Sequence, residues 1–349
     1  SEIPGIQGGS QVTLKELLRA AVANGGVRII PGHFEKTYFH WIDNLRPWCI
    51  SRQIWYGHRV PVWYRGEEVA VGEAPLGEGW VQDEDTLDTW FSSGSWTFST
   101  LGWPDQTDDL ARFHPTTLLE TGYDILFFWI ARMILMSGFA LGQVPFKDTY
   151  LHGIVRDAQG RKFSKSLGNG IDPIDMIEKF GADAVRMSLL VGNTPGTDMR
   201  LSEDKIKGYK HFANKLWNIS RFVLENTEVD SPDAPVTDED AALLDALSRL
   251  AAEVTTDLEE YRLYMAAEKL YHYVWHELAD VILESSKPLL AGGDEVSRRS
   301  RAAALRRILR EVLILLHPFM PYVTEEIWQS LPEKSADLLM VASWPHADA

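Results

Sequence analysis

The chain has 349 residues, which as a prior on domain size corresponds to about two domains. Hydrophobic residues make up 45% of it and charged residues 24%, a composition typical of globular proteins that excludes intrinsic disorder and fibrous repeats. The formal net charge is −16, with 34 basic against 50 acidic residues, so a protein that coats nucleic acid indiscriminately is excluded and any contact with RNA is expected to be local.

The single cysteine and the longest apolar run restrict the compartment. Cys49 cannot form an internal disulfide or a multi-cysteine zinc site, and a lone cysteine fits a reducing compartment. The apolar run 125–142 carries Arg132 at its middle, where insertion into a bilayer would cost about 2.5–3.5 kcal/mol. We therefore expect a cytoplasmic protein in which this run is a buried helix, with no membrane partner and no bound zinc or other resident metal.

Short strands alternate with helices in the first part of the chain. Apolar residues at helical spacing are interleaved with short β-branched runs, and turn residues separate them. The pattern predicts a helix over 12–23, a strand over 27–30, an aromatic segment over 41–63, a glycine-rich connection over 66–80, a strand over 149–155, a polar turn over 157–160 and a helix over 174–190. This alternation favours a parallel α/β sheet in residues 1–196.

Long helical periodicities replace the strand signals from about residue 197 onward. They cover residues 205–225, 238–261, 264–283, 295–316 and 322–329. A segment with Pro232 and Pro235 among acidic residues, 226–237, is predicted to be a loop between two of these helices. The sequence therefore predicts an α/β fold in residues 1–196 followed by an all-α domain in residues 197–349.

Two stretches of the helical part are rich in cations. Residues 200–221 hold six lysines and arginines against two acids, and residues 298–310 hold six arginines and no acid. Such clusters are candidate phosphate contacts, although solvated helix faces with intrahelical ion pairs are an equally ordinary explanation that stays open here. The candidate RNA contacts are Lys207, Lys210, Lys215, Arg221, Arg298, Arg299 and Arg306.

The strongest local signal is the segment G-R-K-F-S-K-S-L-G-N, residues 160–169. Lys162 and Lys165 lie three residues apart in a polar loop between two glycines. Glycines give such a loop freedom to move, and two ammonium groups can clamp a polyphosphate as charge builds up during nucleotidyl transfer. A solvated surface turn is the alternative explanation of the same residues.

The string K-F-S-K-S at 162–166 resembles the KMSKS signature of class I aminoacyl-tRNA synthetases, with phenylalanine at the methionine position. Further stretches resemble the valyl enzymes in the same order along the chain. They are W-C-I-S-R-Q-I-W-Y-G-H-R-V-P-V-W-Y (48–64), D-E-D-T-L-D-T-W-F-S-S (83–93), F-S-T-L-G-W-P (98–104), T-G-Y-D-I-L-F-F-W-I-A-R-M (121–133), S-L-G-N-G-I-D-P (166–173), N-K-L-W-N (214–218) and H-P-F-M-P-Y-V-T-E-E-I-W (317–328).

The resemblance implies a fold and an activity. The fold is the second half of a Rossmann-type nucleotide-binding catalytic domain followed by a helical-bundle anticodon-binding domain. The activity is aminoacyl-tRNA ligation, in which valine reacts with ATP to form valyl-adenylate and is then transferred to tRNA(Val). ATP enters as its Mg²⁺ complex, and the partners are valine, ATP and tRNA(Val).

The resemblance also implies an amino-acid pocket and adenylate contacts. Trp90, Ile125 and Trp129 would form a small apolar slot for an isopropyl group, and on a helix the spacing of the latter two places them on one face. Without the resemblance they would be ordinary core residues. Gly122 and Asp124 would lie against the adenylate, although Asp124 could also cap a helix.

The remaining implied contacts are with the nucleotide. His152 and Gly153, at the end of a predicted strand, would contact the adenine, because glycine lets a base approach the backbone. Lys162 and Lys165 would stabilise the pentavalent α-phosphate and the leaving pyrophosphate. Phe163 is assigned to ATP binding, and Ser164 and Ser166 to the same catalytic loop.

The sequence also departs from the family pattern. It lacks an H-I-G-H-like signature, the inserted editing domain, the cysteine pairs that some relatives use for zinc, and a C-terminal coiled-coil arm. The chain begins with Ser1 and shows no signal peptide. We therefore expect a fragment that has little adenylation activity until the N-terminal half is supplied. The alternatives are a non-catalytic tRNA-binding module, a fragment of the isoleucyl type and a paralogue that has lost catalysis.

Overall fold

The structure, a computed structural model, describes residues 3–7, 10–164, 167–227 and 236–345. It divides into two compact units, Ser1–His152 and Gly153–Ala349, which are described separately below. The predicted domain boundary at 196/197 lies inside the second unit, and the division into two domains at that point stays a prediction.

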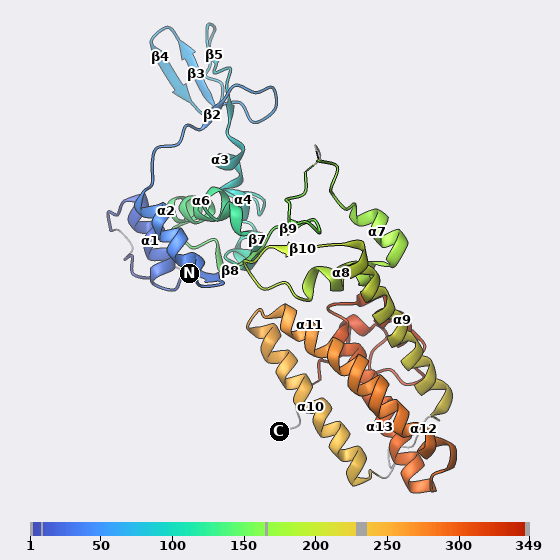
Figure 1. Ribbon diagram of the computed structural model, residues 1–349. Helices are drawn as coiled ribbons and strands as arrows, with labels where there is room; N and C mark the ends of the chain where they lie inside the picture. The colour runs from blue at the N-terminus through green and yellow to red at the C-terminus, as the bar shows by residue number, and fades with distance from the viewer. Residues whose placement is uncertain (1–2, 8–9, 165–166, 228–235, 346–349) are drawn as a thin grey trace. The chain divides into compact units, whose positions relative to one another are not determined.

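The first unit contains a parallel sheet and the helices that pack on it (Figure 1). Its elements are α1 (Leu14–Ala23), β1 (Arg28–Ile30), α2 (Phe34–Asp43), β2 (Ser51–Arg52), β3 (Val62–Arg65), β4 (Glu68–Val71), β5 (Val81–Gln82), β6 (Thr86–Leu87), α3 (Thr89–Ser93), α4 (Trp96–Ser99), α5 (Asp108–Phe113), β7 (Thr116–Gly122), η1 (Tyr123–Ile125), η2 (Leu126–Ala131), α6 (Arg132–Leu141) and β8 (Phe146–His152).

The sheet has the strand order β1-β8-β7, and all three strands run parallel. Its buried residues, among them Ile29 and Phe146, belong to the same core as the inner faces of α1, α2 and η2–α6. Helix α1 begins with a capping box, in which Thr13 accepts from the Glu16 amide while the Glu16 side chain accepts from Thr13. Gly138 lets α6 approach α1, because a Cβ there would lie 2.5 Å from Leu17.

A small antiparallel sheet, β4-β3-β5, is carried between α2 and α3, and β2 pairs with β6 at its base. Figure 1 shows it as a separate projection of the first unit. The predicted glycine-rich connection over 66–80 is therefore only partly correct, because β4 lies within it. Gly66, with φ of +61°, makes the tight turn that lets β4 pair with β3.

One helical stretch, Tyr123–Leu141, is long and apolar enough to cross a membrane among the residues that the structure describes, with a mean hydropathy of 1.7. Its Leu126, Ile130 and Ile134 are buried in the core of the first unit, and Arg132 pairs with Asp88 at 3.6 Å. These contacts agree with the predicted core helix, although the segment begins as a 3₁₀ turn and a π-helix instead of a regular α-helix.

The second unit begins with a small parallel pair of strands and continues as a helical bundle. Its elements are β9 (Val155–Arg156), α7 (Pro173–Phe180), α8 (Ala182–Leu190), β10 (Met199–Arg200), α9 (Glu203–Asn226), α10 (Asp238–Glu259), α11 (Leu263–His272), η4 (Tyr273–Ile282), α12 (Leu283–Gly292), α13 (Glu295–Leu316), α14 (Pro321–Gln329) and η5 (Leu339–Val341). The predicted strand 149–155 is divided between β8 and β9.

Gly153 explains that division. A Cβ at this position would lie 1.8 Å from the carbonyl oxygen of Thr197, so only glycine lets the two backbones approach so closely. Next to it, Asp198 accepts from the Ile154 amide at 2.8 Å and holds β9 beside β10. The break in the strand is therefore a close crossing of two backbones and not a loop.

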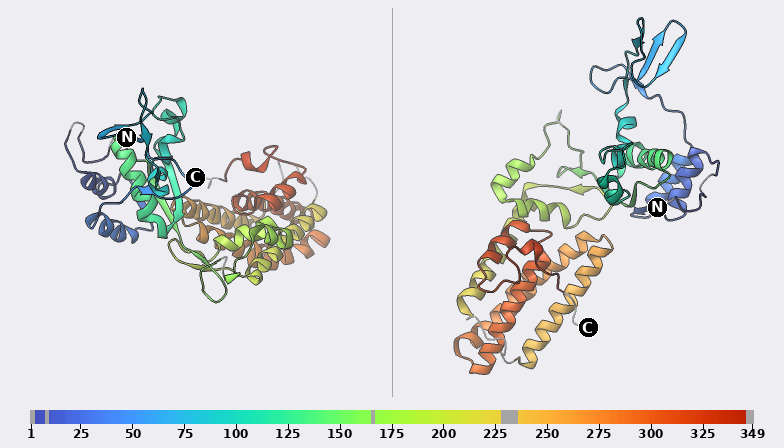
Figure 2. Two further views of the ribbon diagram at one scale, coloured as in Figure 1. Left: turned by 90° about the horizontal axis from the view of Figure 1, so that it is seen from above. Right: turned by 180° about the vertical axis from the view of Figure 1, so that it is seen from behind.

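The bundle core joins α9 to α14, and its buried side chains include Phe212, Leu247, Leu309 and Trp328. Figure 2 shows the long helices side by side in both views. Helix α13 has the bounds that the sequence predicts, α9 extends one or two residues beyond its predicted bounds at each end, and α10 begins where predicted and ends two residues earlier. Helix α12, which contains Pro288, was not predicted, and residues 228–235 of the predicted loop 226–237 lie outside the described residues.

Candidate functional site

The carboxyl ends of the three parallel strands meet at one edge of the sheet in the first unit. β1 ends at Ile30, β7 at Gly122 and β8 at His152, and the last two residues are direct partners in the ladder. Ligands bind preferentially at this edge in open α/β sheets. The sheet therefore places two of the predicted ATP contacts, Gly122 and His152, side by side.

Aromatic and charged side chains surround this edge. Tyr123 stacks on Phe34, with ring centroids 5.5 Å apart, and Asp124 in η1 is exposed next to it in sequence. The imidazole of His152 lies 3.3 Å from a carboxylate oxygen of Glu120. The predictions did not include Phe34 or Glu120, although residue 34 follows the predicted strand 27–30 and lies where a strand end would place it.

The tryptophans of the predicted amino-acid pocket lie on α3 and η2, which pack together. Trp90 stacks on Phe128 with ring centroids 5.6 Å apart, and the indole N–H of Trp129 donates to the carbonyl of Ser93 at 3.1 Å. Ile125 ends the 3₁₀ turn and Trp129 lies in the π-helix, so the α-helical spacing argument does not describe this pair. π-Helical turns are frequent at functional sites.

Asp88, which the predictions did not include, lies immediately before α3. Its carboxylate accepts from the indole N–H of Trp48 at 2.7 Å and is paired with Arg52 at 3.3 Å and Arg132 at 3.6 Å. The Arg132 guanidinium also lies over the Trp48 ring, 4.4 Å from its centroid. Burial lowers the pKa of Arg132, and the Asp88 carboxylate opposes this effect. The feature of the sequence that could have pointed to Asp88 is its position two residues before the predicted pocket residue Trp90.

An apolar cavity of about 400 Å³ opens beside this cluster. It lies between α1, α2, η2–α6 and the segment that leaves α2. Its lining residues are Leu14, Leu18, Ile42, Leu45, Arg46, Pro47, Trp48, Ile50, Phe91, Phe127, Ala131, Arg132, Leu135 and Met136. The three predicted pocket residues are not among them, so the predicted pocket and this cavity are different features.

The lysine-bearing loop lies in the second unit, and Asp157 and Asn169 hold its base. Asp157 accepts from the Arg161 amide at 2.8 Å and from the Asn169 amide group at 2.8 Å, while Asn169 accepts from the Ser164 amide at 2.9 Å. The Asn169 and Arg161 contacts lower the pKa of Asp157 to about 2. The two ends of the loop are therefore held together by hydrogen bonds to an ionised carboxylate. Neither base residue was among the predicted site residues.

Within this loop, Lys162 is exposed and its backbone bridges to Arg156, which extends the β9 strand pair. Phe163 packs against the small core that includes Met176 and Ile206, so its ring anchors the loop to the helices. Lys165 and Ser166 lie outside the described residues, and the roles predicted for all the loop residues stay predictions.

The candidate RNA contacts on α9 and α13 differ in their surroundings. On α9, Lys207 is exposed, Lys210 donates to the Lys179 carbonyl at 2.9 Å, Lys215 pairs with Asp280 at 3.1 Å, and Arg221 pairs with Glu225 of its own helix at 3.3 Å.

On α13 the cations are held by the protein itself. Arg298 pairs with Glu295 at 2.6 Å, and Arg306 donates to the carbonyl of Thr227. Arg299, the third predicted contact, also has interactions within the structure. The predictions did not include Arg301, which is buried in the same stretch.

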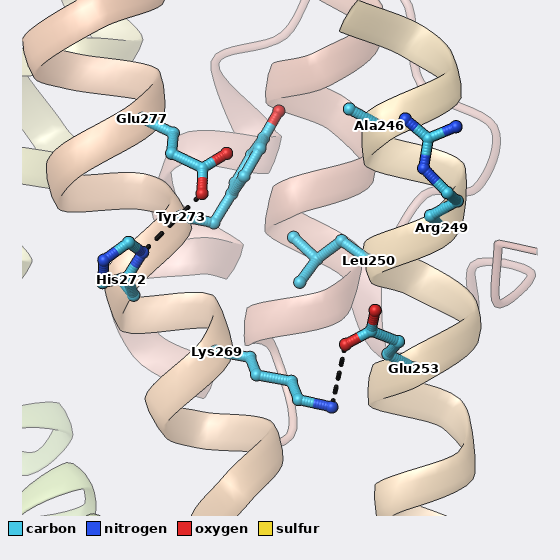
Figure 3. Close-up of a pocket in the computed structure, with 8 residues that line it drawn as sticks. All are labelled: Ala246, Arg249, Leu250, Glu253, Lys269, His272, Tyr273 and Glu277. Atoms are coloured by element: carbon cyan, nitrogen blue, oxygen red, sulfur yellow. Dashed lines mark ion pairs between the residues drawn. The ribbon is translucent and has the colours of Figure 1, made fainter.

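A further pocket of about 340 Å³ lies between α10 and α11–η4 (Figure 3). Its rim carries charged side chains from both sides, and its floor contains Leu250 and Tyr273. Lys269 pairs with Glu253 at 2.9 Å across the gap, and also with Asp257 at 2.8 Å. Because Lys269 and Glu253 pair across the opening, we interpret this pocket as part of the packing interface between α10 and α11–η4.

Among the described residues, no group of three or more histidines, cysteines, aspartates and glutamates has the arrangement of a metal site. Cys49 is exposed, and its thiol lies within hydrogen-bonding distance of Ser51.

Two family models match the chain. The model of class I tRNA synthetases (I, L, M and V) matches residues 10–74 and 74–202. The model of the anticodon-binding domain of tRNA ligases matches residues 240–349. The first therefore covers the sheet and the lysine-bearing loop, and the second covers most of the helical bundle.

Individual relatives are similar over nearly the whole chain. A valine–tRNA ligase of Oceanobacillus iheyensis is 47% identical over 339 residues, which cover 94% of this chain and 38% of that protein. A valine–tRNA ligase of Syntrophotalea carbinolica is 49% identical over 347 residues, which cover 95% of this chain and 39% of that protein. The chain thus spans about two fifths of the length of these curated relatives.

Solved structures share the fold. Methionyl-tRNA synthetase of Mycobacterium tuberculosis in complex with methionyl-adenylate has a TM-score of 0.74 at 23% identity and covers 90% of this chain and 60% of its own. A LeuRS–tRNA–LeuAMS complex from Agrobacterium radiobacter K84 has a TM-score of 0.71 at 21% identity and covers 88% of this chain and 44% of its own. The predicted fold class, α/β of Rossmann type followed by a helical domain, is confirmed.

Proposed function

We propose, from the premise that the chain belongs to the class I tRNA synthetases of the isoleucine, leucine, methionine and valine group, that it is part of a valine–tRNA ligase. The observation that carries this proposal is the 45–49% identity with valine–tRNA ligases over 94–96% of the chain. The proposed reactions are the activation of valine by ATP and the transfer of the valyl group to tRNA(Val), in the cytoplasm.

In the proposed activation step, a carboxylate oxygen of valine attacks the α-phosphorus of MgATP. A new phosphorus–oxygen bond forms, the bond from the α-phosphorus to the bridging oxygen breaks, and pyrophosphate leaves with the electron pair. No general base is needed, because the carboxylate is already an anion. Positioning of the two substrates and stabilisation of negative charge carry the rate.

The chain's own residues would supply these two effects. The edge formed by Gly122 and His152 supports binding of the adenylate, with Asp124 at the ribose or the substrate ammonium. Lys162 and Lys165 would place positive charge on the phosphates. The hydrogen bonds that Asp157 accepts from Arg161 and Asn169 support this role, because they fix the start and the end of the lysine-bearing loop. Magnesium would supply further charge on the pyrophosphate while it is bound to the nucleotide.

The proposed amino-acid pocket consists of Trp90, Ile125 and Trp129. The packing of α3 on η2 supports it, since Trp129 donates to Ser93 one turn after Trp90. A slot of this kind separates valine from isoleucine by one methylene, which is worth about 1–3 kcal/mol. Transfer to tRNA would involve the basic residues of α9 and α13.

The test is ATP–pyrophosphate exchange with valine, measured on the chain mixed with the N-terminal catalytic half of one of the relatives. We expect exchange with valine in the mixture and little or none with the chain alone, since the H-I-G-H-like signature is not in this sequence. Exchange that is absent in the mixture, or that requires isoleucine instead of valine, contradicts the proposal.

A second function, tRNA binding without chemistry, is favoured by one observation, the match of residues 240–349 to an anticodon-binding domain. Filter binding of tRNA to the isolated chain separates the two functions. Binding with a steep dependence on salt, together with no exchange in the mixture, supports the binding module alone.

A further inference from the structure

Asp88 connects the segment between α2 and β2 to α3, which contains Trp90, and to α6, which follows the π-helix that contains Trp129. The Asp88 amide donates to the carbonyl of Ile50 at 2.7 Å, so the start of α3 is bonded to the segment that leads from α2 to β2. The Asp88 carboxylate accepts from Trp48 in this segment and pairs with Arg52 in β2 and with Arg132 at the start of α6. One side chain thus joins three segments.

The same contacts lead back to Trp90. The Trp48 ring meets Phe128 edge to face, with centroids 5.9 Å apart, and Phe128 stacks on Trp90 with centroids 5.6 Å apart. Asp88 lies two residues before Trp90 on the chain and bonds to Trp48 at the other end of the stack. Asp88, Trp48, Phe128 and Trp90 therefore form a closed circuit of contacts.

The burial of Asp88 makes the circuit stiff. Its side chain is 8% exposed and that of Arg132 is 14% exposed, so the pair lies largely out of water. Removal of one partner from a buried pair leaves an uncompensated charge, whereas the intact pair with good hydrogen bonds holds one geometry. Neutralising Asp88 would leave Arg52 and Arg132 facing each other without the anion between them.

We propose that Asp88 is a positioning residue for the amino-acid pocket: it fixes the indole of Trp48, and through Phe128 the ring of Trp90, at the place where Trp90 meets the substrate side chain. The effect on substrate rests on the proposed function, but the effect on Trp90 does not. Asp88 itself touches no reacting atom.

The first test reads the position of Trp90 in the chain as it exists. The chain is labelled with 5-fluorotryptophan, and Trp90→Phe assigns the Trp90 signal in the ¹⁹F NMR spectrum. Asp88→Asn and Trp48→Phe should each shift or broaden that signal. The matched control is Asp43→Asn, which removes the exposed pair with Arg19 in the same unit and should leave the signal in place.

Two variants keep this test decisive. Trp48→Phe keeps an aromatic ring against Phe128 but loses the N–H donor and the fused five-membered ring, so it probes the circuit even where Asp88→Asn lowers stability. A Trp90 signal that stays at its wild-type position and width in both variants overturns the proposal, and so does an equal change in Asp43→Asn.

The second test is valine-dependent exchange in the mixture with the N-terminal half of a relative. In Asp88→Asn the KM for valine should rise about tenfold, because a misplaced pocket wall costs binding and alignment, while the KM for ATP stays at the wild-type value. A general loss of structure would instead lower the amount of active enzyme and leave both KM values unchanged, which contradicts the proposal. If the wild-type mixture shows no exchange, the proposed function fails, and the ¹⁹F result still decides the role of Asp88.

Discussion

Helices α9 and α13 are both rich in cations, yet the protein uses those cations differently. On α13, Arg301 is buried against Asp240 of α10, and Arg307 pairs with Glu311. On α9, Lys207 is exposed and has no ion-pair partner among the described residues. The acids that neutralise α13 lie outside its basic stretch, so a count of charges within the stretch does not reveal them.

The difference separates two roles for a basic helix. Arg301 of α13 ties this helix to α10 and α12, because a guanidinium with several donors can satisfy carboxylates and hydroxyls at once. On α9, the exposed Lys207 leaves positive charge at the surface, where a phosphate can reach it. The RNA-facing role is therefore a proposal for α9 first and for α13 second.

The largest effect is expected for Arg301→Met, which breaks the buried group at α13. The Arg301 side chain is 1% exposed, and it also donates to Ser286 at 3.1 Å and pairs with Glu239 at 2.7 Å. Loss of one partner leaves the Asp240 carboxylate buried without its cation, so the free energy of unfolding should fall by about 3–5 kcal/mol. Urea denaturation followed by circular dichroism measures this.

The matched control for that variant is Arg298→Met, which removes the same charge from the same helix at an exposed pair. Surface pairs contribute about 0–1 kcal/mol, so its urea midpoint should stay close to that of the wild type. Equal losses in the two variants would contradict the structural role assigned to the buried arginine.

A second expected effect concerns the base of the lysine-bearing loop. The pKa of Asp157 is lowered to about 2, below its ordinary value of about 3.9. A carboxylate with a lowered pKa stabilises the folded loop above its ordinary pKa, and this contribution is lost as the pH falls from about 4 to about 2. Amide hydrogen exchange should therefore show weaker protection of Arg161 at the low end of that window.

Asp157→Asn should produce the same loss at neutral pH, because it removes the charge while keeping the size of the side chain. Asp175→Asn, at an exposed acid on α7, is its control and should leave the Arg161 amide as protected as in the wild type. A protected Arg161 amide in Asp157→Asn would show that the loop is held by other contacts.

A smaller effect tests the surface of α9 directly. Lys207→Ala should lower the slope of log affinity against log salt for tRNA by about one, since one phosphate contact is lost. Filter binding over a salt series measures the slope. Arg298→Ala on α13 should lower the slope less, because Arg298 is already paired with Glu295, and the reverse result would exchange the roles of the two helices.

The smallest effect is expected for Arg221→Gln. Arg221 and Glu225 form an exposed pair four residues apart on α9, and such pairs contribute about 0.2–0.5 kcal/mol. The free energy of unfolding from urea denaturation should change by no more than that. A loss of several kcal/mol would show that α9 depends on its cations as α13 does.

Periodicity predicted the helical part of the fold well, since α9, α10 and α13 are long and have one apolar face. It predicted the sheet less completely. β7, in the sheet with β1 and β8, was missed, because its short T-T-L-L-E-T-G segment lacks a strong pattern and its pairing is with a strand about thirty residues later. α12 was missed because Pro288 interrupts the helical signal.

Residues of the candidate site could be predicted from the sequence where they lie in a family motif. Residues such as Asp88, whose role depends on contacts between distant segments, could not. The family resemblance names Gly122 and His152, and the pairing of β7 with β8 brings them together. Nothing in the sequence indicates that Asp88 joins Trp48 to Arg132, because these residues are 40 and 44 positions from Asp88 and meet only after folding. Likewise, the buried state of Arg301 depends on acids from α10.

In the π-helical segment Leu126–Ala131, the number of residues matters more than which apolar residues they are. A π-helical turn contains one residue more than the corresponding α-helical turn, and each residue of an α-helix rotates the chain about the helix axis by about 100°. Deleting one codon there would restore ordinary geometry and swing every preceding side chain around the axis. Changes of length in this segment should thus be far less tolerated than exchanges of one apolar residue for another.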